Sequence, residues 1–126
     1  MSLIDSDALI DLLRGLPFAI KWMQSQDEPL HIPGYVVIGL IQGCRDSREL
    51  AQVQKLVAKF ELVWGTSTGL QAGLEKLSPF VLSDGLSGFD LQIASVALEF
   101  VATLYTFNYK HFSHVPELKI SKPYVR

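Results

Sequence analysis

Short apolar runs alternate with helical patterns along the whole chain. The apolar runs predict buried strands at Leu3–Ile4 and Leu30–Ile32. Further strands are expected at Glu61–Trp64 and Ala102–Thr106, and Leu118–Ile120 predicts an edge strand. Strands that alternate with helices form a mainly parallel sheet with helices on both of its faces. The sequence therefore predicts an α/β fold.

Helical segments fill the intervals between these strands. Their apolar residues recur at helical spacing, or the segment follows a proline, a break or a capping signal. The expected helical segments are Leu9–Arg14, Leu16–Gln24, Tyr35–Cys44, Asp46–Phe60, Leu70–Val81 and Phe89–Phe100, with a turn or short helix at Asn108–Phe112. Gly15 ends the first of them. We expect Ser83–Gly88 to be a loop.

Composition narrows the class of protein. A chain of 126 residues with 48% hydrophobic content is expected to form one domain over residues 1–126 with a substantial core. No apolar run approaches the roughly 20 residues of a membrane span, and no secretory signal precedes the first strand, so we expect a soluble cytoplasmic protein. Cys44 is the only cysteine, which excludes an internal disulfide and a multi-cysteine zinc site.

The net charge of −2 gives no general basic footprint for nucleic-acid binding. A nucleic-acid role would therefore require local basic patches or a bound cation. Arg45, Arg48, Lys110 and His111 are the candidates for such phosphate contacts. Each of them also has a simpler interpretation, because a charged side chain on a helix or turn is usually solvated.

Three polar side chains stand where strands end or helices begin. Asp5 follows the first strand, Asp90 opens the helix Phe89–Phe100, and Asn108 comes just after the strand Ala102–Thr106. Each has a local explanation, because Asp5 suits a helix cap, Ser87 with Asp90 matches a capping box, and asparagine is common in turns. A parallel sheet can also gather all three at its carboxyl edge, where such folds bind ligands.

Two or three oxygen ligands completed by water suit Mg²⁺ or Mn²⁺. A cation held there would lower the pKa of a bound water and would clamp a phosphate oxygen, which is what hydrolysis of a phosphodiester requires. The carboxylates repel one another without a cation, so we expect the metal to stabilise the fold.

Four segments in this order resemble a PIN domain of the VapC-like toxin type. They are Leu3–Gly15, Leu40–Asp46, Gly85–Ala94 and Ala102–Phe112. The resemblance spans essentially the whole chain. It implies a three-layer α/β/α PIN-like fold and a magnesium- or manganese-dependent endoribonuclease that hydrolyses RNA. It also implies a homodimer and a cognate antitoxin protein as partner.

The resemblance also implies roles for individual residues. Asp5 and Asp90 match the two metal-site aspartates of the family, and Asn108 matches a position that completes the catalytic set. Thr106 falls where the family places a threonine or serine, and Asp7 falls where it more often has asparagine. We therefore expect Asp5 and Asp90 to hold the metal, and Asp7 and Thr106 to support them.

Gly39 departs from the family pattern. The family has a metal-site glutamate at this position of the central helix, so the site lacks one carboxylate. Glycine inside a helix lowers its stability by about 1 kcal/mol relative to alanine. The presence of Gly39 in this helix therefore needs an explanation. Close helix packing is one explanation. The other is that Gly39 replaces the glutamate, in a naturally attenuated copy or in a clone selected because an active toxin harms its host.

Two alternative functions stay open at this point. In the first, the fold is kept for pairing with an antitoxin, and Gly39 leaves it catalytically impaired. In the second, Asp5 and Asp7 serve phosphoryl transfer, because an Asp-x-Asp at a strand end is similar to the site of haloacid dehalogenase-like phosphatases. The second fits less well, since no later strand-end lysine and acidic motif complete such a site.

Overall fold

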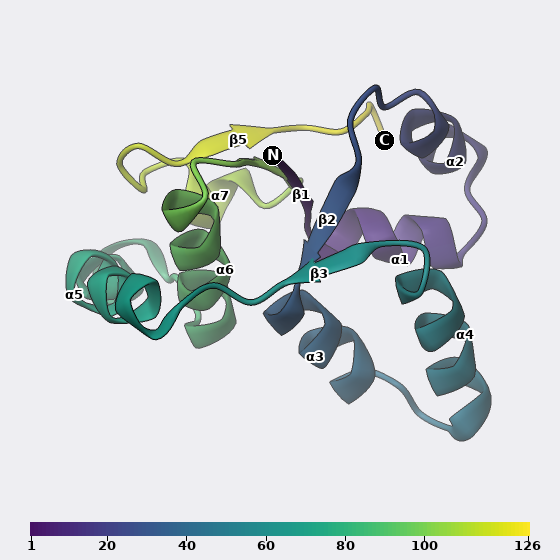
Figure 1. Ribbon diagram of the computed structural model, residues 1–126, viewed down its shortest axis with the longest axis horizontal. Helices are drawn as coiled ribbons and strands as arrows, with labels where there is room; N and C mark the ends of the chain where they lie inside the picture. Colours follow the sequence, from purple (N-terminus) through teal and green to yellow (C-terminus); the bar gives the residue numbers. More distant parts are fainter.

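Five short strands form one parallel sheet in the computed structural model, which describes residues 1–126 (Figure 1). The strands are β1 (Ser2–Ile4), β2 (Leu30–Pro33), β3 (Glu61–Val63), β4 (Thr103–Tyr105) and β5 (Lys119–Ser121). Their order across the sheet is β3-β2-β1-β4-β5, and every neighbouring pair is parallel. The predicted α/β class, the parallel sheet and the edge position of the last strand are confirmed.

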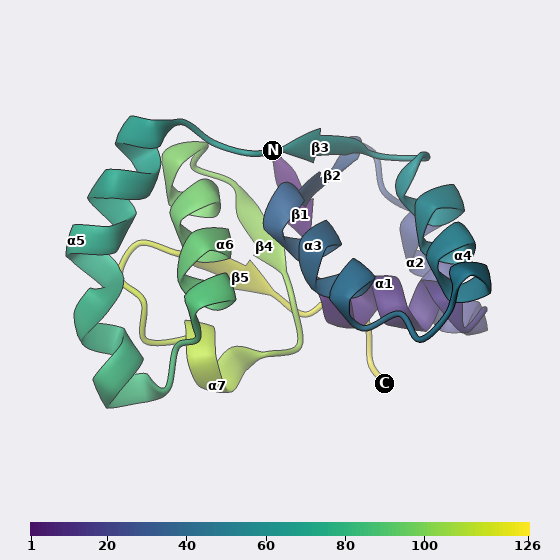
Figure 2. The same ribbon diagram turned by 90° about the horizontal axis from the view of Figure 1, so that it is seen from below.

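Helices cover both faces of this sheet. They are α1 (Ser6–Leu13), α2 (Pro17–Gln24), α3 (Gly34–Gln42), α4 (Ser47–Val57), α5 (Ser67–Asp84), α6 (Gly88–Glu99) and α7 (Tyr109–Phe112). The chain moves outward from β1 to β3 and then crosses back to β4, so right-handed connections place the early and late helices on opposite faces. Figures 1 and 2 both show α1, α2 and α4 on one side and α5 with α6 on the other.

Side-chain caps set the starts of four helices, and those of α1 and α4 use aspartate. The Asp5 carboxylate accepts a hydrogen bond from the Ser6 amide at 2.7 Å and caps α1. Asp46 caps α4 by accepting from the Glu49 amide at 2.8 Å, as the capping-box spacing predicts. The return bond of that box is absent, because the Glu49 carboxylate accepts instead from the backbone amide of Arg45 at 2.9 Å.

The fifth helix is longer than the sequence pattern predicts. α5 continues to Asp84 and α6 begins at Gly88, so the prediction of a loop over Ser83–Gly88 is correct only for residues 85–87. The helix ends at Gly85, whose φ of 72° is the left-handed conformation that glycine adopts readily. The amide of Leu86 then donates to the Phe80 carbonyl at 3.2 Å, and the Leu86 side chain is buried. The hydrogen bond and the buried Leu86 side chain stabilise the last turn of α5.

The centre of the sheet carries the core. Twenty buried hydrophobic residues form one cluster, in which Leu3 and Ile4 of β1 are fully buried together with Ile32 of β2 and Leu104 of β4. Strands buried on both faces read as continuous apolar runs, which is why the sequence shows them clearly. No helix combines the length and the apolar character that crossing a membrane requires.

The helices α5 and α6 pack closely because glycine faces a small polar side chain. A Cβ atom at Gly73 would overlap the Oγ and Cβ atoms of Ser95. The Ser95 hydroxyl is buried and donates to the Leu91 carbonyl at 2.7 Å, so it has little freedom to move aside. At Gly39 of α3, in contrast, nothing lies within 4 Å of an added Cβ.

We therefore predict opposite effects of alanine at these two helical glycines. Gly39→Ala should raise the free energy of unfolding by up to about 1 kcal/mol, because alanine favours a helix and meets open space. Gly73→Ala should lower it by about 1–3 kcal/mol, because the added methyl group overpacks the α5–α6 contact. Urea unfolding of both variants measures the difference, and a shift of the same sign in both would contradict this packing.

Candidate functional site

The pairing of β1 with β4 brings Asp5 beside Thr106. Ile4 pairs with Tyr105 in the parallel register, and the Asp5 amide donates to the Tyr105 carbonyl at 3.0 Å. The next residue on each strand is then Asp5 and Thr106, and the Thr106 hydroxyl donates to Asp5 Oδ2 at 2.7 Å. The two residues are 5% and 0% exposed. Strand register therefore brings the Thr106 hydroxyl to Oδ2 of this carboxylate, while the Ser6 amide holds Oδ1.

Asp7 lies in the first turn of α1 and shares the same threonine. Its Oδ2 accepts from the Phe107 amide at 2.8 Å and lies 3.3 Å from Thr106 Oγ1, and its Oδ1 accepts from the Ala8 amide at 2.8 Å. The Thr106 hydroxyl has one proton and lies closer to Asp5 than to Asp7. Asp7 is thus held by two backbone amides, and its supporting role stays a prediction.

Asp90 opens α6, and its backbone and side chain make different contacts. Its amide donates to Ser87 Oγ at 3.1 Å, so the cap of α6 uses the backbone of Asp90 rather than its carboxylate. The carboxylate Oδ2 lies 3.3 Å from His111 Nδ1, which in turn lies 3.1 Å from Asn108 Nδ2. The backbone amide of Asn108 donates to Thr106 Oγ1 at 3.0 Å. Because Thr106 also contacts Asp5, this hydrogen bond connects Asn108, His111 and Asp90 to Asp5.

A cavity of about 380 Å³ lies at the carboxyl edge of the sheet. Its lining includes Asp5, Ser6, Asp7, Gly39, Asp90 and Asn108. The sequence predictions for these positions therefore converge on a single place. Close helix packing, the first explanation for Gly39, is wrong, because an added Cβ there meets no atom within 4 Å.

The basic residues predicted from the sequence differ in how they relate to this cavity, and none of them is part of its lining. Arg45 is exposed and pairs with Glu49, with Nη2 and Oε2 2.7 Å apart, and it lines a neighbouring groove that shares Gly39 with the cavity. Arg48 and Lys110 are exposed. His111 differs from the other three, because it contacts Asp90 and Asn108 directly. RNA contact by these residues stays a prediction.

The electrostatics of the cavity favour a cation. Burial raises the pKa of Asp5 to about 6, the negative charge of Asp7 adds to the rise, and the charge of Asp90 contributes as well. Hydrogen bonds from Thr106 and Ser6 offset only part of this increase. Burial also raises the pKa of Asp7, against hydrogen bonds from the Phe107 and Ala8 amides. Carboxylates in this arrangement are costly to ionise unless a positive charge joins them.

The donor set fits a hard divalent cation with few protein ligands. No group of three or more His, Cys, Asp or Glu side chains is close enough to hold a metal ion. Mg²⁺ is commonly bound through one or two carboxylates and keeps several waters. Asp5, Asp90 and Asn108 line the cavity, and their side chains carry oxygen atoms of this kind.

Arg126 makes contacts beside the site that the sequence does not predict. The guanidinium of Arg126 donates to the carbonyl of Asp7 at 3.3 Å and to Oδ2 of Asp11 at 3.0 Å. The partners lie more than a hundred residues apart in the chain. Arg126 matches no motif, so only the folded chain reveals its place beside Asp7.

The comparisons with known proteins give a clear result for the fold. No protein-family model matches the chain, and no curated protein matches it. Among solved structures, a DNA-bound VapBC complex from Salmonella typhimurium matches with a TM-score of 0.83 and 17% identity, over 98% of this chain and 100% of that chain. A toxin-antitoxin complex from Klebsiella pneumoniae matches with a TM-score of 0.76 and 20% identity, over 100% of both chains.

A third match is FitAcB from Neisseria gonorrhoeae, with a TM-score of 0.71 and 17% identity, over 98% of both chains. The chain has a PIN-like fold. The fold expected from the sequence resemblance is thereby confirmed, over essentially the full length that the resemblance covers. Within this PIN-like fold, Gly39 lies on the cavity wall shared by Asp5 and Asp90, where the resemblance expects a glutamate.

The raised pKa of Asp5 predicts how stability depends on pH. The folded-state pKa of about 6 lies above the ordinary value of 3.8, so the folded protein binds the extra proton between these values. The stabilisation by protonated Asp5 is present at low pH and is lost as the pH rises through about 6, by about 3 kcal/mol in total.

Urea unfolding between pH 4 and pH 8 in the presence of a chelator tests this prediction. The unfolding free energy of the wild type should fall by about 2.4 kcal/mol more over this range than that of Asp5→Asn, since the rest of the change lies below pH 4. Asp27→Asn, which removes an exposed carboxylate away from the cavity, serves as the matched control and should follow the wild type. Equal pH slopes for the wild type and Asp5→Asn would contradict the prediction.

Proposed function

We propose that this protein is the toxin component of a toxin–antitoxin pair and that it acts as a divalent-metal-dependent endoribonuclease. One observation carries the proposal. Asp5, Asp90 and Asn108 come from three separate elements and line one cavity at the carboxyl edge of the sheet, in a chain with a PIN-like fold. Ligands in open parallel sheets bind at this edge.

Asp5 and Asp90 would hold Mg²⁺ or Mn²⁺. When bound, such a cation supplies Lewis-acid stabilisation of a phosphate oxygen and activates water for hydrolysis. Thr106 orients the Asp5 carboxylate through its hydroxyl, and Asn108 presents an amide to the same cavity. The open cavity leaves room for a phosphodiester beside these groups.

The phosphates of an RNA strand require positive charge beyond the cavity. Arg48 and Lys110 have exposed side chains, and Arg45 lines the adjoining groove. Each of them can contact a backbone phosphate without reading sequence. With a net charge of −2, the chain depends on such local contacts and on the cation to attract RNA.

The partners in this proposal are an antitoxin protein and a second copy of the chain. The support for the antitoxin is that the matched structures are VapBC, FitAB and toxin-antitoxin complexes. An apolar surface is available on α3, where Ile38 and Ile41 are exposed beside the groove between α1, α3 and α4. The proposed setting is the cytoplasm, where RNA, antitoxin and toxin meet.

Gly39 favours a second candidate, a PIN-fold module that pairs with an antitoxin and cuts RNA poorly. The open space at Gly39 is of the kind that a glutamate side chain would fill, and without it the cavity has no group of three metal-binding side chains. Phosphoryl transfer through Asp5 is less favoured. Both Asp5 oxygens accept hydrogen bonds, and no lysine lines the cavity.

We predict that Gly39→Glu raises metal-dependent RNA cleavage by roughly tenfold or more, because ligand charge count tunes cation affinity. The assay follows cleavage of a mixed RNA substrate with Mg²⁺ or Mn²⁺, and a chelator should abolish the activity. Gly39→Gln is the matched control, since it adds nearly the same volume without the charge and should give no gain.

The double variant Gly39→Glu with Asp5→Asn separates the two candidate functions. It should lose the activity gained, because Asp5 is a proposed ligand of the cation. If Gly39→Glu shows no gain over the wild type, the attenuated-nuclease interpretation fails. If neither protein binds metal or cleaves RNA, the binding module is the better description.

A further inference from the structure

The C-terminal segment is fastened to α1 through a buried carboxylate. Asp11 accepts from Tyr124 Oη at 2.7 Å and from Arg126 Nε at 3.0 Å on Oδ2, and Arg126 Nη2 lies 3.3 Å from Oδ1. The side chain of Asp11 is only 4% exposed. These hydrogen bonds lower the pKa of Asp11, although its burial acts to raise it. The ionised Asp11 carboxylate thus holds the C-terminal segment to α1 through Tyr124 and Arg126.

Aromatic packing reinforces this anchor. The Tyr124 ring lies 5.0 Å from the Phe107 ring, 5.3 Å from the Phe18 ring and 5.9 Å from the Trp22 ring, measured between centroids. All three pairs are tilted or edge-to-face, which is a favourable arrangement for aromatic rings. The segment is therefore held at Tyr124 before the chain reaches Arg126.

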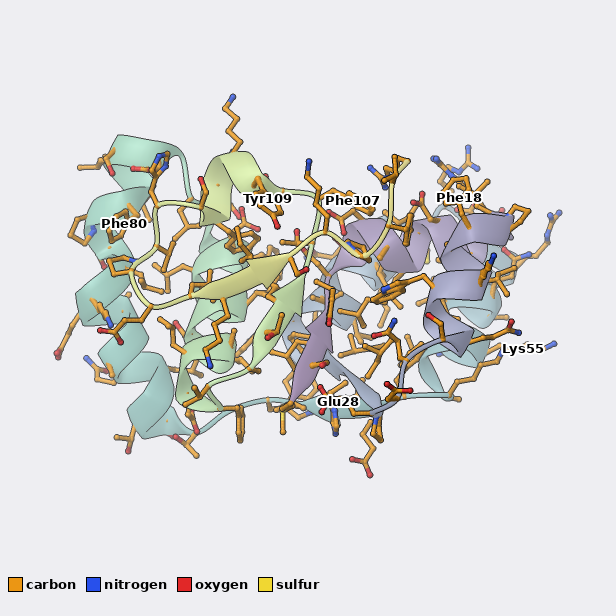
Figure 3. The ribbon with its side chains drawn as sticks, turned by 90° about the horizontal axis from the view of Figure 1, so that it is seen from above. Phe18, Glu28, Lys55, Phe80, Phe107 and Tyr109 are labelled. Atoms are coloured by element: carbon orange, nitrogen blue, oxygen red, sulfur yellow. The ribbon has the colours of Figure 1, made fainter.

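Arg126 contacts both partners of one hydrogen bond in the site. Its Nη2 donates to the Asp7 carbonyl at 3.3 Å, and its guanidinium lies 4.2 Å from the centroid of the Phe107 ring. The Phe107 amide in turn donates to the Asp7 carboxylate at 2.8 Å. In Figure 3, Phe107 lies where the C-terminal segment passes the amino-terminal end of α1.

We propose that Arg126, fixed by Asp11 and Tyr124, is a positioning residue that holds the Asp7 carboxylate and the Phe107 amide together at the edge of the cavity. The guanidinium suits this task, because its planar fork can hydrogen-bond in several directions while it stacks on an aromatic ring. The consequence for cation binding rests on the proposed function, whereas the consequence for the Phe107–Asp7 hydrogen bond does not.

The contacts of Arg126 with Asp7 and Phe107 matter for the carboxylates of the cavity. Asp5 and Asp7 are neighbouring carboxylates that share Thr106, and they repel one another. The Thr106 hydroxyl has only one proton and lies closer to Asp5, so Asp7 depends on the Phe107 and Ala8 amides to keep its position. Groups that orient metal-site residues in this way typically change metal affinity by about 10–100-fold when they are removed.

The first test reads the hydrogen bond directly. Hydrogen exchange by NMR compares the Phe107 amide in the wild type, Arg126→Ala and Arg126→Lys. We expect exchange at Phe107 to be about tenfold faster in Arg126→Ala through local opening, with Arg126→Lys between the two. The Thr66 amide, which donates to the Glu99 carboxylate at 3.0 Å, and the amides of β1 serve as references.

These references separate positioning from general stabilisation. A purely structural role of Arg126 would speed exchange at the β1 amides as much as at Phe107, because both would report global unfolding. That outcome, or unchanged exchange at Phe107, would overturn the proposal. Faster exchange at Phe107 alone supports it.

The second test measures Mn²⁺ affinity of the full chain by calorimetry, without RNA. Arg126→Ala should weaken binding by about tenfold. Arg14→Ala is the matched control, since Arg14 is an exposed arginine of the same region whose charge also acts on Asp11, and it should leave affinity unchanged. Equal affinity in the wild type and Arg126→Ala would overturn the link to the cavity. If the wild type binds no Mn²⁺, the proposed function fails, and the exchange result alone decides the positioning.

Discussion

The pairing of β1 with β4 is the interaction on which the site depends. It places Asp5 at the end of one buried strand and Thr106 at the end of the next, and the hydroxyl-to-carboxylate bond between them is 2.7 Å long. Asn108 is tied to the same threonine, and Asp7 lies within reach of it. A buried carboxylate is stable only with such partners, so the sheet register and the site are formed together.

Much of this arrangement could be predicted from the sequence. The central strand β1 is a short buried apolar run, and the acidic residue Asp5 directly follows it, at the carboxyl edge where parallel sheets bind ligands. The positions of Asp90 and Asn108 on the same cavity follow from the same rule once the strand order is known. The sequence also showed that position 39 carries no carboxylate, but it could not show that the space around Gly39 is open.

Other features were hidden because they depend on contacts between distant parts of the chain. The role of Arg126 requires Phe107 and Asp7 to meet, and no local pattern marks an arginine for such a place. The close approach of Gly73 to Ser95 depends on how α5 lies against α6. His111 was a candidate phosphate contact in the sequence, but the approach of its ring nitrogen to within 3.3 Å of the Asp90 carboxylate could not be predicted. Packing decides each of these cases, and sequence periodicity carries no information about it.

The central claim is that Asp5 and Asp90 bind one divalent cation in the cavity although Gly39 contributes no carboxylate. Anomalous diffraction from a crystal of the wild-type chain soaked in Mn²⁺ tests this claim most directly. The account predicts one anomalous peak within coordination distance of carboxylate oxygens of both Asp5 and Asp90, at roughly 2.0–2.4 Å. The absence of a peak between these two side chains, at a Mn²⁺ concentration that saturates Gly39→Glu, would contradict it.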